Sequence, residues 1–313
     1  MHPYDYHAGD WRFEVEVSET SSRSHYKLSF PSPAPAEWKD DNNVYGDLFV
    51  PRRDRPVPLV VITHGFGDTS LAPCMTLARL LVRQGIAALT WYLPFHSRRL
   101  PQALRGIYEP LTAAEWLEIY RSSVIELRRI IDWVSELKEI DRTRLAAAGI
   151  SMGGIVSSIA MGVDSRISAG IFIVTGGHME ELSWGGKIEM LFTGHGCSRE
   201  ECAAVYAQYP AYLDEVAQKG IENIKPAKEC FLFDPLTFAG SIGSRPVLMV
   251  CADRDEMVSE KSTRYLWEAC GKPPLVRVTD SHVGTYCQSS LLSTEITRFM
   301  GSLSRSYSGT GGT

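Results

Sequence analysis

The sequence has no long apolar run and no cluster of basic residues. None of its apolar stretches approaches the roughly 20 residues that a helix needs to span a bilayer. The formal charge is -5, and Lys and Arg occur together only in short pairs. The sequence therefore lacks the basic surface by which proteins bind nucleic acid or anionic membranes. We expect neither as a partner, and the sequence leaves the oligomeric state open.

The amino-terminal residues and the cysteines indicate a reducing location. Residues 1–15 lack the basic start and apolar core of a signal peptide, which predicts a cytoplasmic protein. The seven cysteines are odd in number and scattered, so we interpret them as free thiols. A metal site at His195, Cys197 and Cys202 is the alternative, but without a second cysteine pair their spacing matches no common zinc site. We expect no metal.

The pattern of apolar runs predicts an α/β fold. Residues 13–18, 25–30 and 44–50 indicate antiparallel strands near the start of the chain. From Pro58 onward, short apolar runs alternate with segments of helical periodicity, as in a mostly parallel central sheet with helices on both faces. These runs are residues 59–63, 86–92, 145–150, 169–174, 247–252 and 275–279.

Helices are predicted at residues 70–83 and 113–137, the second opened by a capping box of Thr112 and Glu115. The interval 176–245 is too long for one crossover helix, so we predict an insertion at about 178–238. It contains a helical stretch, 200–219, that is broken at Pro210. The insertion either forms a cap over the carboxyl ends of the strands or packs on the side of the sheet. Residues 1–301 then form one domain, and the Ser- and Gly-rich residues 302–313 a flexible tail.

The most informative motif is Gly149-Ile-Ser151-Met-Gly153, at the junction of a buried strand and a helix. A serine on such a sharp turn is held out as a nucleophile, and the flanking glycines leave room for the turn. The alternative is a serine that only caps the helix. A nucleophilic serine needs a histidine base and a carboxylate that orients the imidazole. Two segments at the carboxyl ends of later strands supply these groups, Asp253-Arg-Asp255 and Asp280-Ser-His282.

These motifs resemble the serine esterases of the α/β-hydrolase superfamily from about Pro58 to Met300. The order nucleophile, acid, histidine along the chain is matched by Ser151, Asp255 and His282. The resemblance favours Asp255 over Asp253, because Asp255 to Val258 fits the family's Asp-x-x-Val loop. It also implies an oxyanion hole formed by the backbone N–H groups of Phe66 and Met152.

The loops at the same sheet edge supply weaker candidates for substrate binding. His64-Gly-Phe66-Gly67 resembles the family's oxyanion loop, and His64 is expected to orient that loop rather than to transfer protons. Candidates for the walls of the site follow other strands or lie in the insertion: Trp91, Tyr92, His96, His178, Trp184 and Phe192. Arg98 or Arg99 either binds a substrate carboxylate or is merely solvated.

The sequence thus predicts a serine esterase that acts on a small-molecule ester and needs no cofactor. One alternative is a peptidase or amidase of the prolyl-oligopeptidase-like branch, because Gly153-Gly154 follows the serine. Against it, the chain is too short for that branch's propeller. A second alternative is a non-catalytic binding protein that keeps the scaffold without the chemistry.

Overall fold

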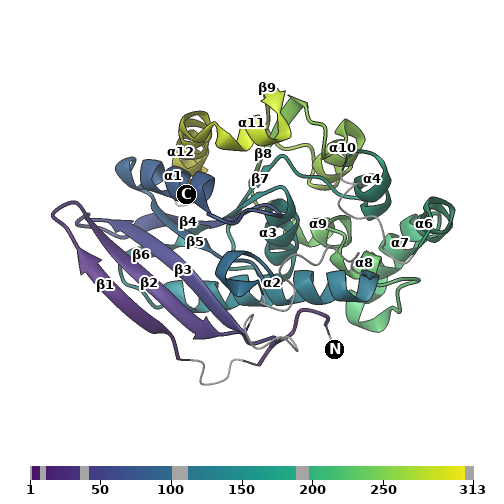
Figure 1. The fold of residues 1–313 in the computed structure, drawn as a ribbon, viewed down its shortest axis with the longest axis horizontal. Coiled ribbons are helices and arrows are strands. Elements are labelled where there is room, and N and C mark those ends of the chain that lie inside the picture. The colour runs from purple at the N-terminus through teal and green to yellow at the C-terminus, as the bar shows by residue number, and fades with distance from the viewer. Residues whose placement is uncertain (1, 8–11, 36–41, 101–111, 188–196, 307–313) are drawn as a thin grey trace, which may run out of the picture.

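The computed structural model describes residues 2–7, 12–35, 42–100, 112–187 and 197–306. Within these residues, nine strands form one sheet in the order β1-β2-β3-β5-β4-β6-β7-β8-β9 (Figure 1). The strands are β1 (Glu14–Glu19), β2 (Arg23–Pro31), β3 (Asn43–Pro51), β4 (Val57–Thr63), β5 (Ala87–Trp91), β6 (Ile140–Ile150), β7 (Ala169–Ile173), β8 (Val247–Arg254) and β9 (Leu275–Ser281).

The direction of the strands follows the predicted pattern. β1, β2 and β3 pair antiparallel, and β3 joins β5 antiparallel. From β5 to β9 all neighbouring strands are parallel. β4, β5, β7 and residues 145–150 of β6 are buried almost throughout because helices cover both faces of the sheet. The prediction of a mostly parallel α/β sheet is confirmed.

Helices lie on both faces of this sheet. They are α1 (Ala72–Arg83), η2 (Ser97–Arg99), α2 (Ala113–Val134), α3 (Met152–Val163), α4 (Met179–Trp184), α6 (Arg199–Tyr206), α7 (Tyr209–Lys219), η4 (Ile221–Asn223), α8 (Cys230–Phe233), α9 (Leu236–Ile242), α10 (Glu260–Ala269), α11 (His282–Cys287) and α12 (Ser289–Ser306). α1 and α12 bury their apolar residues against one face, and α2 and α3 against the other.

Local sequence chemistry sets several helix ends. The capping box of α2 forms as predicted: Thr112 accepts a hydrogen bond from the amide of Glu115, and the Glu115 carboxylate accepts one from the amide of Thr112. The helical stretch predicted at 200–219 is broken as expected. α6 ends at Tyr206, and Pro210 lies in the first turn of α7, where its missing N–H needs no partner.

The segment between β7 and β8 contains α4, α6, α7, η4, α8 and α9, which gather at one end of the molecule (Figure 1). Tyr206, Tyr209 and Tyr212 are buried there around Phe231. At the other end of the chain, α12 continues to Ser306, so the domain boundary predicted after residue 301 falls within this helix. Residues 307–313 lie outside the described part of the chain.

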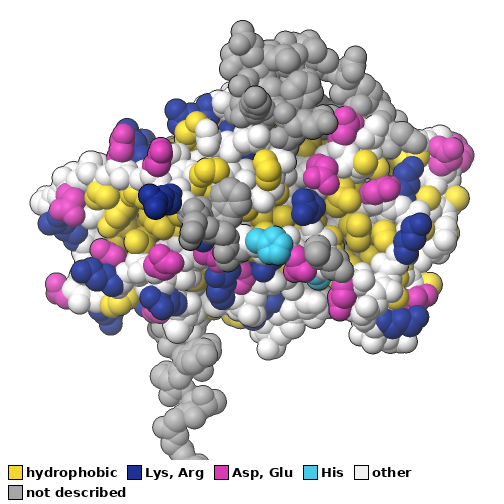
Figure 2. Space-filling model, turned by 90° about the horizontal axis from the view of Figure 1, so that it is seen from below, with side chains coloured by type: hydrophobic (Ala, Val, Ile, Leu, Met, Phe, Trp, Pro, Cys, Tyr) yellow, Lys and Arg dark blue, Asp and Glu magenta, His cyan; other side chains and the backbone are white. Residues whose placement is uncertain are grey.

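The surface shows no concentration of one charge on the face turned to the viewer in Figure 2, where acidic and basic side chains are interspersed. None of the helices within the described ranges has the combination of length and hydrophobicity needed to cross a membrane.

Candidate active site

Ser151 lies on the sharp turn between β6 and α3, with backbone angles φ 53° and ψ -118°. A residue with a side chain rarely adopts a positive φ, so the surrounding structure must hold this turn in place. The amide of Ser151 donates to the carbonyl oxygen of Ile173 in β7 over 2.9 Å. The Ser151 hydroxyl makes no capping hydrogen bond to α3. A purely capping role, the alternative left open by the sequence, is therefore not what the structure shows.

Glycine is required on both sides of the serine. A Cβ atom added to Gly149 would collide with the carbonyl group of Gly153. A Cβ atom added to Gly153 would collide with the carbonyl oxygen of Thr63 at the end of β4. Because backbone atoms occupy these positions, the two glycines allow β4, β6 and α3 to approach closely enough to form the turn.

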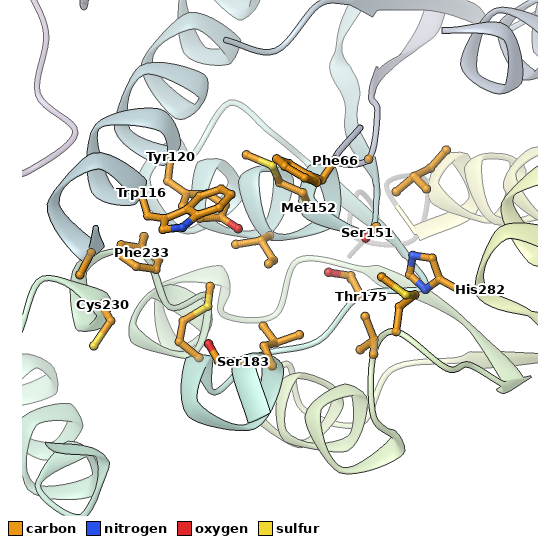
Figure 3. A pocket seen from close by; sticks show the side chains of 18 of the residues that line it. Phe66, Trp116, Tyr120, Ser151, Met152, Thr175, Ser183, Cys230, Phe233 and His282 are labelled. Carbon is orange, nitrogen blue, oxygen red and sulfur yellow. The ribbon is translucent and has the colours of Figure 1, made fainter. Parts of the chain in front are cut away.

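His282 and Asp255 meet at the carboxyl ends of β8 and β9. Nδ1 of His282 lies 2.9 Å from both carboxylate oxygens of Asp255. A carboxylate accepts hydrogen bonds, so this contact selects the tautomer of the neutral imidazole that has its proton on Nδ1 and a lone pair on Nε2. The imidazole is turned toward Ser151 (Figure 3). The backbone holds Asp255 in turn, because its Oδ1 accepts from the amides of Met257 and Val258.

Asp253, the alternative acid, does not approach the histidine. Its exposed carboxylate accepts from the Thr279 hydroxyl over 3.3 Å and lies 3.7 Å from Arg277. β8 ends at Arg254, so Asp255 has left the strand and turns toward α11, while Asp253 remains in the strand.

The loop after β4 is fixed by His64, which is fully buried. Nε2 of His64 accepts a hydrogen bond from the amide of Leu93, so the proton resides on Nδ1, which donates to the carbonyl oxygen of Gly65 over 2.7 Å. Burial lowers the pKa of His64, so the ring is neutral and does not shuttle protons. Because a trans peptide is planar, this bond also sets the direction of the Phe66 N–H, opposite to the Gly65 carbonyl.

The two residues predicted to supply the oxyanion donors lie close to Ser151. A Cβ atom added to Gly65 would be 3.3 Å from Cβ of Ser151, so the loop that carries the Phe66 amide lies against the serine. Met152 is the first residue of α3, where backbone N–H groups have no acceptor within the helix. Both residues line the same pocket as Ser151 and His282.

A pocket of about 200 Å³ opens beside Ser151 and is mainly apolar. Ser151 and His282 lie at one end, and Cys230 and Phe233 of α8 at the other (Figure 3). The helices between β7 and β8 supply one wall, which includes Met179, Leu182, Val205 and Tyr206. Of the two placements that the sequence left open, this wall matches the cap rather than a side-packed elaboration.

Trp116 and Tyr120 of α2 form part of the opposite wall, and the sequence did not single them out as site residues. A signal for them existed. A helix that connects parallel strands begins at the carboxyl edge of the sheet, and in open α/β sheets ligands bind at that edge. The first two turns of α2 are therefore placed to meet a ligand, whereas its later turns can only pack on the sheet.

Most of the predicted wall residues lie elsewhere. Trp91, Tyr92, His96, His178 and Trp184 are not among the residues that line this pocket. Trp91 is buried within the sheet, where its indole N–H donates to Thr63. His178 stacks on Tyr265, and its ring lies tilted against Tyr206, which does line the pocket. Phe192 lies outside the described residues.

His96 supports the oxyanion loop rather than the substrate. Its ring packs edge-on against His64 and Phe66, with centroid distances of 4.9 and 5.4 Å. Burial lowers the pKa of His96 to about 3, and its Nδ1 lies 2.7 Å from the carbonyl oxygen of Pro94. It therefore stays neutral.

Neither role that the sequence left open for the arginines, substrate binding or solvation, applies to Arg99. Its guanidinium is buried and donates to both carboxylate oxygens of Glu126, at 2.7 and 2.8 Å. The guanidinium N–H groups that could bind a carboxylate of the substrate are therefore already bonded to Glu126. Arg98 is exposed and lies over the ring of Tyr45, 4.3 Å from its centroid.

The candidate metal ligands do not form a cluster in the part of the chain that is described. His195 lies outside it, and the structure shows no group of three or more His, Cys, Asp or Glu side chains, among the residues it describes, that could hold a metal ion. Cys197 and Cys202 are free thiols that line the pocket.

Residues 12–178, more than half of the 313 residues, match the family described as Alpha/beta hydrolase domain containing 18. The chain belongs to this family. The matched segment of Alpha/beta hydrolase domain containing 18 includes the His64 loop and Ser151, whereas Asp255 and His282 follow it. No curated protein matches the sequence.

Solved structures of esterases have the same fold as this family member. An acetyl xylan esterase from Paenibacillus sp. R4 aligns with a TM-score of 0.64 and 17% identity, over 94% of this chain and 89% of that one. A glucuronoyl esterase from Solibacter usitatus aligns with a TM-score of 0.62 and 13% identity, over 96% of this chain and 88% of that one. Est1E from Butyrivibrio proteoclasticus, with bound ferulic acid, aligns with a TM-score of 0.57 and 18% identity, over 86% of this chain and 99% of that one. At these identities the likeness establishes an α/β-hydrolase fold.

Proposed function

We propose that this protein is a serine hydrolase that cleaves carboxylic esters through an acyl-enzyme intermediate. The observation that carries the proposal is the contact of Nδ1 of His282, as hydrogen-bond donor, with both carboxylate oxygens of Asp255, while the imidazole is turned toward a serine on a strained turn. A histidine held in this tautomer presents Nε2 as a base to the serine hydroxyl.

In the proposed reaction, the Ser151 oxygen attacks the ester carbonyl while His282 takes its proton. The amides of Phe66 and Met152 donate to the oxyanion that forms. Collapse of this intermediate breaks the bond to the alcohol, and His282 returns the proton to the leaving oxygen. Water, activated by His282, then releases the acid from Ser151.

The pocket supports an ester rather than a peptide as the substrate. A peptidase that binds a free amino end needs carboxylates in its site. Among the described lining residues the only carboxylate is Asp68, whose Oδ1 already accepts from the amides of Ser70 and Leu71 at the start of α1. An apolar acyl group fits this lining better.

A fluorophosphonate probe tests the proposal, because it reacts with an activated serine and leaves a stable adduct. We expect mass spectrometry to find the adduct on Ser151 and a panel of p-nitrophenyl esters to be hydrolysed. If no adduct forms and no ester is hydrolysed, the proposal is overturned in favour of a binding protein. Faster hydrolysis of matched p-nitroanilides than of the esters would instead favour an amidase.

A further inference from the structure

Lys228 is the only Lys or Arg among the described residues that line the pocket. It lies two residues before α8, whose Cys230 and Phe233 form the end of the pocket remote from Ser151 and His282 (Figure 3). The pocket therefore has its catalytic groups at one end and a cation near the other, with mainly apolar side chains between them.

No described carboxylate neutralises this cation. Lys228 is half-buried, and no acidic side chain in the described ranges lies within ion-pair distance of its ammonium group. Lys219 and Lys261, by contrast, pair with Glu215 and Glu181. A cation that lines an apolar pocket and has no ion pair among the described residues favours an anionic group on the ligand.

The chemistry of the proposed reaction decides which part of the ester enters this pocket. The leaving oxygen must lie next to His282, because the histidine gives it a proton. The acyl group then lies on the other side of Ser151, along the pocket toward Phe233. The volume of about 200 Å³ exceeds the roughly 150 Å³ that accommodates a benzene ring, so an acyl group of about six or more carbons fits.

We propose, on the basis of the function proposed above, that the preferred acyl group carries a carboxylate at its far end, which pairs with Lys228. The substrates are then half-esters of medium-chain dicarboxylic acids. Hydrolysis releases the dicarboxylate and the alcohol, and it needs only water as co-reactant.

Two substrates that differ only in this charge test the proposal: mono-p-nitrophenyl suberate and its methyl-capped diester. We expect the protein to hydrolyse the free acid with a kcat/KM about 10-fold higher, the size of one charge-assisted hydrogen bond. Lys228→Gln should abolish the preference. Lys228→Glu should invert the preference. The matched control is Lys225→Gln, an exposed lysine of the same loop that does not line the pocket.

Equal rates for the two esters, or a preference that survives Lys228→Gln, would overturn the proposal while leaving esterase activity intact. Failure of the proposed function looks different, because neither ester would then turn over. In that case, calorimetry with monomethyl suberate still tests whether Lys228 binds the carboxylate of a ligand. Lys228→Gln should weaken binding about 10-fold, and unchanged binding would overturn the proposal.

Discussion

The imidazole of His64 connects two loops that are 29 residues apart: Nε2 accepts from the amide of Leu93, and Nδ1 donates to the carbonyl oxygen of Gly65. The next peptide N–H along the chain belongs to Phe66, the proposed oxyanion donor. His64 thus acts as a positioning residue, since it fixes the peptide plane from which that N–H points.

Replacing His64 by Ala should lower kcat about 100-fold with a smaller change in KM, as expected when one oxyanion donor is misplaced. His64→Gln, whose amide can both accept and donate, should restore part of the activity. Steady-state kinetics with a p-nitrophenyl ester measures both variants. If kcat stays the same and only the melting temperature falls, His64 has a purely structural role.

Ser151→Ala should lower kcat by about 10⁴ or more, because only binding and the oxyanion hole remain. The free energy of unfolding should change little, since the hydroxyl makes no capping bond. Ester hydrolysis and urea denaturation check the two expectations. An alanine variant that kept most of the activity would exclude the proposed mechanism.

Asp255→Asn and Asp253→Asn form a matched pair two residues apart. An amide at position 255 no longer selects the useful tautomer of His282, so kcat should fall by about 10³ to 10⁴. Asp253 is exposed and bonded to Thr279, so its replacement should change kcat less than about threefold. A larger loss of kcat in Asp253→Asn than in Asp255→Asn would identify Asp253 as the acid that orients His282.

The buried neutral His96 predicts a pH dependence of stability. Its folded-state pKa, about 3, lies below the value of about 6.5 expected in the unfolded chain. The unfolded state therefore binds a proton that the native state does not, and stability is fully present above pH 6.5 and lost as the pH falls toward 3. The loss is about 1.4 kcal/mol per pH unit.

Urea denaturation at several pH values measures this effect. When the pH is lowered from 7 to 5, the free energy of unfolding should fall by about 2 kcal/mol less in His96→Leu than in the unaltered protein. Identical pH profiles for the two proteins would mean that His96 is protonated in the native state.

The buried pair of Arg99 and Glu126 should be costly to break. Glu126→Gln leaves the guanidinium without its counter-charge and should lower the free energy of unfolding by about 3 to 5 kcal/mol. The exposed pair of Lys219 and Glu215 is the control, and Glu215→Gln should cost less than about 1 kcal/mol. A small effect at Glu126 would show that water reaches the arginine.

The sequence by itself determined the local features of this protein. Alternating apolar and polar residues predicted β1 to β3, and short apolar runs predicted the parallel strands from β4 to β9. Thr112 and Glu115 marked the start of α2, and Gly149 and Gly153 marked the turn at Ser151. These features are readable because they depend on residues only a few positions apart, through side-chain periodicity, capping and steric clearance.

Only the tertiary structure decided which side chains meet. A family resemblance favoured Asp255 over Asp253, but the contact of Asp255 with His282 depends on where the chain leaves β8 relative to α11. Arg99 was available for a substrate until Glu126, 27 residues away, proved to occupy it. The lining of the pocket likewise comes from helices that are distant in sequence, such as α2 with Trp116 and α8 with Phe233. Such contacts depend on how whole elements pack, so no pattern within a short stretch of the chain records them.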